Sequence, residues 1–182
     1  RIPSTVGEND IVAAFSVTPG VVTTGDQGGQ LYVRGGTPIQ NKILLDGMTI
    51  YQPFHSIGFF SIFETELVKS ADIYTGGFDA QYGGRISSIM DITYRDGNNK
   101  KFSGKASLSP FMGKLVLEGP LLGGKKEGPG GISYVFSAKQ SLIDRSAELL
   151  YPNINRDRDE DGNYIGESPG MPFSFTDLYG KL

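Results

Sequence analysis

The chain has 182 residues, a formal net charge of −3 and no cysteine. The lack of cysteine excludes a disulfide framework, a Cys-ligated zinc site and thiol catalysis, and the scattered lysines and arginines form no basic stripe that would indicate nucleic-acid binding. Twenty-six glycines, about twice the average share, indicate many tight turns rather than long helices.

The first predicted element is a short helix over Glu8–Val17. Glu8 and Asp10 complement the positive end of the helix dipole, and Pro19-Gly20 ends the helix. One face of this helix is apolar and is expected to pack under a sheet; it consists of Ile11, Val12 and Phe15.

Three strands are predicted next, over Leu31–Arg34, Lys42–Leu45 and Met48–Tyr51. Asp46-Gly47 lies between the last two and tolerates the positive φ angles of a type I′ turn. We expect the resulting hairpin to form the centre of a small sheet.

The following segment, Gln52–Phe63, is predicted to be an aromatic loop, with one helical turn within Ile62–Leu67. Two further strands are predicted, over Val68–Tyr74 and Ile86–Tyr94, and the second turns Ile86, Met90 and Ile92 toward one face. A polar, turn-forming run at 95–101 then marks a domain boundary. We therefore predict two domains, 1–97 and 98–182.

The second domain contains longer segments that alternate apolar and polar residues, Lys105–Glu118 and Gly131–Lys139, separated by a turn at Leu121–Gly131. This pattern suits transmembrane β-strands of about 9–11 residues, and a soluble β-sandwich alternates in the same way. A long, charged, proline-containing loop follows at about 145–171. No apolar stretch approaches the ~20 residues that a membrane-spanning helix needs.

Several motifs occur in an order that resembles one family: a Pro-Gly after a helix, YVRGG at Tyr32–Gly36, LLDG at Leu44–Gly47, YTGGFDAQYGGR at Tyr74–Arg85, LEGPL at Leu117–Leu121 and SAKQSLID at Ser137–Asp144. The chain resembles TonB-dependent outer-membrane receptors, especially the SusC-like receptors of Bacteroidetes. The resemblance implies an α+β fold: a small plug domain with a mixed β-sheet and short helices, followed by the first antiparallel strands of a transmembrane β-barrel.

The function implied by the resemblance is ligand-gated, energy-coupled nutrient uptake across the Gram-negative cell outer membrane, with the plug inside the barrel lumen. The implied partners are outer-membrane lipid, the TonB-ExbB-ExbD energy complex, acting through a segment upstream of Arg1, and a candidate SusD-like surface lipoprotein. We expect the chain to be part of a longer protein. The alternative is a plug-fold stopper or binding subunit of another envelope channel. The transported ligand is not indicated by the sequence.

Two arginines beside glycine pairs, Arg34 and Arg85, are the candidates for plug-to-barrel contacts, because guanidinium groups pair well with carboxylates on a barrel wall. The alternative is exposed or locally paired arginines. A candidate ligand-facing loop contains the chain's only histidine and its aromatic neighbours, Tyr51, Gln52, Phe54, His55, Phe59 and Phe60. A packed loop histidine is the alternative there.

Asp157, Asp159 and Asp161, followed by Gly162, spell the front half of a calcium-binding loop over 157–167. Glu167 lies one residue short of the position of the bidentate glutamate in an EF-hand, so a solvated acidic loop is the alternative. No pair of carboxylates is placed for acid–base catalysis. We therefore predict that the protein is not an enzyme and requires no cofactor.

Overall fold

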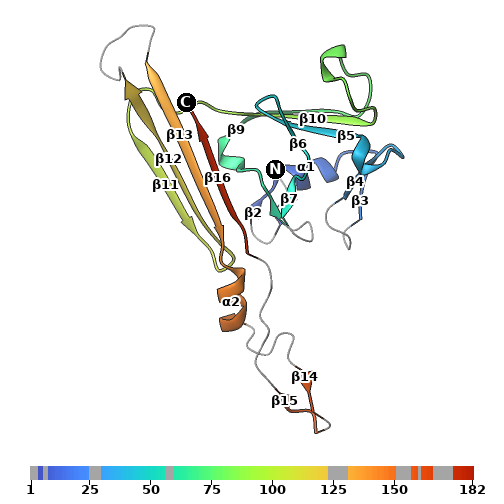
Figure 1. Cartoon of the computed structure of the whole chain (residues 1–182), viewed down its shortest axis with the longest axis vertical. Coiled ribbons are helices and arrows are strands. Elements are labelled where there is room, and N and C mark those ends of the chain that lie inside the picture. The colour runs from blue at the N-terminus through green and yellow to red at the C-terminus, as the bar shows by residue number, and fades with distance from the viewer. Residues whose placement is uncertain are drawn as a thin grey trace. The chain divides into compact units, whose positions relative to one another are not determined.

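The computed structural model describes residues 4–5, 8–24, 30–55, 60–122, 131–150, 157–159, 161–165 and 174–182. The chain divides into two compact units, Arg1–Arg95 and Asp96–Leu182 (Figure 1). Among the described residues, no helix is long and apolar enough to cross a membrane.

The described part of the first unit contains mostly strands, with one α-helix and three 3-10 helices. Its elements are β1 (Ser4–Thr5), β2 (Glu8–Asn9), α1 (Ile11–Ser16), β3 (Val21–Thr24), β4 (Gln30–Val33), η2 (Pro38–Gln40), β5 (Asn41–Leu45), β6 (Met48–Ile50), β7 (Phe54–His55), β8 (Phe60–Ser61), η3 (Thr65–Leu67), β9 (Val68–Tyr74), η4 (Ala80–Tyr82) and β10 (Ser88–Tyr94). The main sheet has the strand order β6-β5-β10-β9. Its β5–β10 pair is parallel and the other two pairs are antiparallel, so the predicted mixed sheet with short helices is confirmed.

Helix α1 begins later than predicted. Asp10 is its N-cap, with an extended backbone (φ −127°, ψ 126°), and its carboxylate accepts hydrogen bonds from the amides of Val12 (2.7 Å) and Ala13 (3.2 Å). An N-cap with this backbone ends the helix on its upstream side, so Glu8 lies in strand β2 instead, opposite Thr5. The predicted apolar face is correct: Ile11, Val12 and Phe15 are all buried.

The predicted turn at Asp46-Gly47 is confirmed, since both residues have positive φ (48° and 80°) and they connect β5 to β6. The predicted central position of this hairpin is wrong. Strand β6 is an edge strand of only three residues, and the central pair is β5 and β10. The Asp46 carboxylate accepts a hydrogen bond from the Tyr94 amide (3.1 Å), which fastens the turn to the end of β10.

Strand β10 is buried on both faces. Consecutive residues Ile89 and Met90 point to opposite sides and are 0% and 1% exposed. On one side, Ile89 packs with Leu44 and Tyr82, and two partly buried rings from Tyr74 and Phe78 pack against this cluster. Ile86 was predicted to lie in this strand on the same face as Met90 and Ile92, but β10 begins at Ser88 and Ile86 lies before it, 78% exposed.

A close contact joins the YVRGG motif to the segment after YGGR. The Ser87 hydroxyl donates a hydrogen bond to the Val33 carbonyl (2.9 Å), and a Cβ added to Gly36 would lie 2.2 Å from Ser87 Oγ and 2.6 Å from Ser87 Cβ. No real side chain fits at those distances. Gly36 is therefore required by the approach of Ser87, although its own φ is not in the left-handed region.

Replacing Gly36 by alanine should destabilise the first unit by about 1–3 kcal/mol, because the added methyl group forces Ser87 and the backbone apart. Hydrogen exchange of the β10 amides Met90 and Ile92 would report the change in unfolding free energy. Gly83→Ala is the matched control, since a Cβ there meets only a carbonyl oxygen at 3.9 Å, and it should change stability by less than about 0.5 kcal/mol. Equal effects of the two changes would contradict the packing argument.

The second unit contains β11 (Ser103–Leu108), β12 (Met112–Leu122), β13 (Ile132–Ser141), α2 (Ile143–Leu150), β14 (Asp157–Arg158), β15 (Tyr164–Ile165) and β16 (Thr176–Lys181). Four of these strands form an antiparallel sheet in the order β11-β12-β13-β16 (Figure 1). The predicted Gly131–Lys139 strand corresponds to β13. Most of the predicted 121–131 turn, at 123–130, lies outside the described residues.

The predicted Lys105–Glu118 segment is two strands rather than one. The chain reverses at 109–111, where the Ser109 amide donates a hydrogen bond to the Met112 carbonyl (2.8 Å). Pro110 stands within this turn and was the available sign of the break. Both strands present apolar residues to the same face of the sheet, at even positions in β11 (Ala106 and Leu108) and at odd positions in β12 (Leu115 and Leu117), so the alternation changes phase at the reversal.

Candidate functional site

Arg34 stands at a tight turn with an unusual backbone. It has φ 49° and is followed by Gly35 with φ 80°, and the Gly36 amide closes the turn on the Val33 carbonyl at 2.8 Å. Positive φ is costly for a residue with a side chain. The turn is held from outside by a hydrogen bond from the Arg34 amide to the Gly20 carbonyl (2.8 Å).

The Arg34 side chain lies over two glycines that are distant in sequence. A Cβ at Gly20 would approach Arg34 Cγ to 3.3 Å, and a Cβ at Gly76 would approach Nη1 to the same distance. Arg34 is nevertheless exposed to solvent. These glycines therefore leave room for an arginine that crosses the surface of the unit, and the first glycine of the Thr75-Gly76-Gly77 segment has a packing role.

Arg85 follows the second predicted glycine pair, in which Gly84 has φ 89°, and its side chain is half-buried. Within the part of the chain that the structure describes, neither Arg34 nor Arg85 forms an ion pair. Among the described residues, no carboxylate is brought together with either arginine. Their contact with a barrel wall stays a prediction.

The predicted aromatic loop is in part a hairpin. Strands β7 and β8 pair so that His55 lies opposite Phe60, and both residues are half-buried, as is Phe54. Tyr51 is 83% exposed and Gln52 is also exposed, just before β7. Phe59 lies outside the described residues. These positions combine exposed and half-buried aromatic groups next to one strand pair, and their role in ligand contact stays a prediction.

Tyr82 and Asp91 form a pair that the sequence did not predict. The Tyr82 hydroxyl donates a hydrogen bond to Asp91 Oδ2 at 2.9 Å, and its ring centroid is 5.4 Å from that of Tyr74. The bond to the Asp91 carboxylate, together with desolvation, raises the pKa of Tyr82 above its ordinary value. The YTGGFDAQYGGR motif therefore carries a structural tyrosine that covers β10.

Because the folded-state pKa of Tyr82 is raised, its contribution to stability is complete below the unfolded pKa of about 10 and is lost as the pH rises above it. Tyr82→Phe should lower stability at neutral pH, since Asp91 loses a hydrogen-bond donor, and should flatten the loss of stability above about pH 10. Denaturant unfolding of both proteins between pH 7 and pH 11 would show this. Parallel stability curves would contradict the role of the pair.

The predicted calcium loop contains a turn held by one aspartate. Asp159 Oδ1 accepts hydrogen bonds from the amides of Asp161 (3.1 Å) and Asn163 (2.7 Å), between β14 and β15. Among the described residues, no group of three or more metal-ligating acids, histidines or cysteines is assembled. Residues 160 and 167 lie outside the described residues, so the calcium site at Asp157, Asp159 and Asp161 stays a prediction.

The two faces of the second unit's sheet differ in polarity. The pairing places Ser107, Lys114, Lys139 and Asp177 in one row across the four strands. In this row, Lys139 Nζ lies 3.3 Å from Asp177 Oδ2, with only 5% of the lysine side chain exposed. Ser137 and Ser141 of this face are also buried, as are three apolar residues of the same face, Met112, Val116 and Val135. We call this face the polar face.

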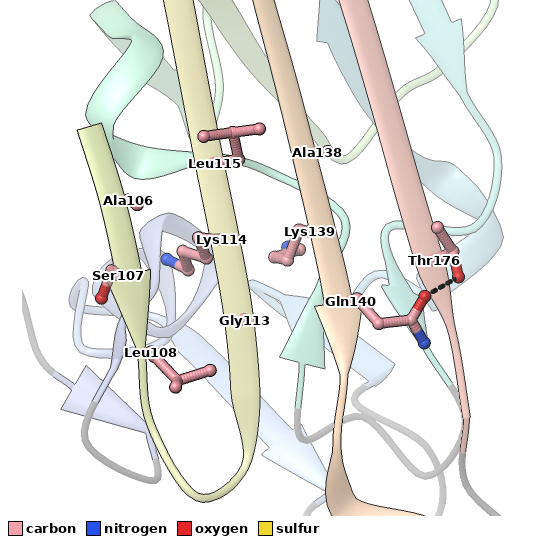
Figure 2. A pocket seen from close by; sticks show the side chains of 10 residues that line it. All are labelled: Ala106, Ser107, Leu108, Gly113, Lys114, Leu115, Ala138, Lys139, Gln140 and Thr176. Atoms are coloured by element: carbon pink, nitrogen blue, oxygen red, sulfur yellow. Dashed lines mark hydrogen bonds between the residues drawn. The ribbon is translucent and has the colours of Figure 1, made fainter. Parts of the chain in front are cut away.

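The opposite face, here the apolar face, carries the next row, Ala106, Leu115, Ala138 and Leu178. Its large side chains are exposed, including Leu108 (81%) and Leu178 (68%). The small residues leave a hollow of about 520 Å³ between Leu108 and Leu115 (Figure 2). The hydrogen-bonded pair Gln140 and Thr176 borders this hollow. A soluble β-sandwich does the reverse, burying its apolar face and exposing its polar one.

Comparison with protein families gives a match for residues 2–88. These residues, slightly less than half of the chain, match the family described as TonB-dependent Receptor Plug Domain. Comparison with curated proteins gave no match.

Solved structures show the same fold. The siderophore receptor PirA from Acinetobacter baumannii is similar over 72% of this chain and 22% of its own, with 20% identity and a TM-score of 0.54. A mutant of the ferric enterobactin receptor PfeA from Pseudomonas aeruginosa is similar over 91% of this chain and 26% of its own, with 16% identity and a TM-score of 0.51. The chain thus spans about a quarter of the length of these receptors.

Proposed function

We propose that this chain is the N-terminal part of an outer-membrane receptor that takes up a nutrient through a gated, energy-coupled barrel. The observation that carries the proposal is the plug-domain match over residues 2–88. A plug domain functions inside a barrel, where it occludes the lumen until ligand and energy are supplied. The proposal requires no catalytic residue and no cofactor.

In this proposal, residues 98–182 begin the barrel wall. Strands β12 and β13 have eleven and ten residues, which suits the roughly 9–11 residues of a tilted transmembrane strand. The exposed apolar face suits contact with lipid, and the pair of buried Lys139 and half-buried Asp177 on the polar face suits a lumen. The long segment after β13, about 145–171, would then be an outer loop.

Single-cysteine labelling can test the orientation of this sheet. Because the chain has no native cysteine, the label attaches only at the introduced position within it. A fluorophore on Leu178→Cys of the complete protein in vesicles should be quenched by brominated lipid, because Leu178 lies on the apolar face. The neighbouring Tyr179→Cys, on the polar face, is the matched control and should be quenched several-fold less. Equal quenching at both positions would contradict the barrel assignment and would favour a plug-fold stopper without its own barrel.

The gating step assigns roles to the plug. Arg34 and Arg85 would pair with carboxylates of the barrel wall, and the exposed end of the plug near Tyr51 and His55 would face the incoming ligand. An upstream segment would receive force from the TonB-ExbB-ExbD complex. The geometry of Arg34 supports such a role. Its backbone lies in a strained turn, and its side chain lies over Gly20 and Gly76, which holds the guanidinium group at the surface.

Deleting residues 2–88 from the complete protein should convert a closed barrel into a conducting one, because a wide barrel without its plug leaves an aqueous channel. Planar-bilayer conductance would measure this. The intact protein should show little conductance, and the deleted protein should show large steady steps. High conductance of the intact protein, or none after deletion, would contradict lumen occlusion.

Three finer assignments belong to the same proposal. The motif order YVRGG, LLDG and YGGR supports a SusC-like subtype, and with it a SusD-like surface lipoprotein as partner. A calcium ion at Asp157, Asp159 and Asp161 would stabilise the outer loop. The solved structures are described as a siderophore receptor and a ferric enterobactin receptor, but a shared fold does not carry over the ligand, so no ligand is assigned to this chain.

A further inference from the structure

Asp10 connects two elements of the plug that are distant in sequence. One carboxylate oxygen, Oδ1, caps helix α1 through the amides of Val12 and Ala13. The other oxygen, Oδ2, accepts a hydrogen bond from the amide of Ser61 in β8, at 3.1 Å and 51 positions along the chain. Asp10 is only 8% exposed and Ser61 only 4%. The Asp10 side chain therefore caps the helix and also contacts the hairpin.

The β7–β8 hairpin has little stability of its own. Each strand has two residues, and the pair forms a sheet separate from β6-β5-β10-β9. The hydrogen bond from the Ile62 amide to the Pro53 carbonyl (3.0 Å) closes the hairpin. An isolated two-stranded hairpin is marginal in water. Contacts from elsewhere in the plug, including the Asp10 bond, must therefore hold this hairpin in place.

We propose that Asp10 is a positioning residue that makes α1 and the β7–β8 hairpin open together. A buried carboxylate that loses a hydrogen-bond donor carries a large penalty, so movement of α1 away from the hairpin raises the free energy of both elements. The direction of the coupling rests on the proposed function: α1 lies toward the pulled N-terminus, and the hairpin carries the ligand-facing candidates Phe54, His55 and Phe60. Asp10 thus links the pulled end to the ligand end.

Two substitutions separate the two bonds. Asp10→Asn keeps one side-chain oxygen, which can still cap α1, but presents an NH₂ group in place of the second oxygen. Asp10→Ala removes both acceptors. Hydrogen exchange of the complete protein should be measured at Val12, Ala13 and Ser61, with the β10 amide of Met90 as the reference for unfolding of the whole plug. In the native protein, the α1 amides and Ser61 should show the same opening free energy and the same denaturant dependence.

In Asp10→Asn, Ser61 should exchange roughly tenfold faster or more relative to Met90, while Val12 and Ala13 change by less than about threefold. In Asp10→Ala, all three should accelerate roughly tenfold or more. Asp46→Asn is the matched control. It removes the same charge from a carboxylate that accepts the Tyr94 amide, and it should leave all three amides unchanged relative to Met90.

Three results would overturn the proposal: different denaturant dependence of α1 and Ser61 in the native protein, unchanged Ser61 exchange in Asp10→Asn, or equal acceleration of Ser61 and Met90. The last would mean that Asp10 only stabilises the plug as a whole. None of these outcomes bears on channel occlusion, which the conductance of the plug-deleted protein tests separately.

Discussion

The first unit depends on the parallel pairing of β5 with β10. Five residues of each strand are in register, from Ser88 opposite Asn41 to Ile92 opposite Leu45, and β10 is buried on both faces. A strand that is buried on both faces has no solvent-facing side, so other residues must pack against each face. Tyr82 and its aromatic neighbours cover one face. The turn at Asp46 also takes its anchor from β10, through the Tyr94 amide.

The small β3–β4 sheet is attached to the main sheet by polar side chains rather than by further strand pairing. The Asn41 side chain donates to the Leu31 carbonyl (2.6 Å) and accepts from the Ser88 hydroxyl (2.8 Å), so it ties β4 to both central strands. Ser87 adds a bond to Val33. Single bonds of this kind are worth about 0.5–1.5 kcal/mol each. Pieces held in this way can open locally without unfolding the central pair, as the proposed movement of the plug would require.

The sequence predicted correctly those elements whose structure depends on neighbouring residues alone. Asp46-Gly47 specified its own turn, and the strand at Val68–Tyr74 has the bounds expected from its sequence. The predictions were wrong where contacts between residues distant in sequence determine the structure. Neither the edge position of β6, the exposed Ile86 nor the Tyr82–Asp91 bond can be inferred without the pairing of β5 with β10. Arg34 and Arg85 were chosen from motifs, and their contact with a barrel wall stays a prediction.

The second unit shows why alternation alone could not decide between a soluble sheet and a membrane wall. Both have a period of two, and the difference lies in which face is buried. Here the buried face holds Lys139, Ser137 and Ser141 beside the apolar Met112, Val116 and Val135, while Leu178 on the other face is exposed. In water this arrangement leaves apolar surface unburied and places a charge in the interior. Lipid on the apolar face removes the first cost, and Asp177 opposite Lys139 reduces the second. This distribution of side chains is the physical argument for the proposal that these strands form a wall between lipid and a polar lumen rather than a free soluble sheet.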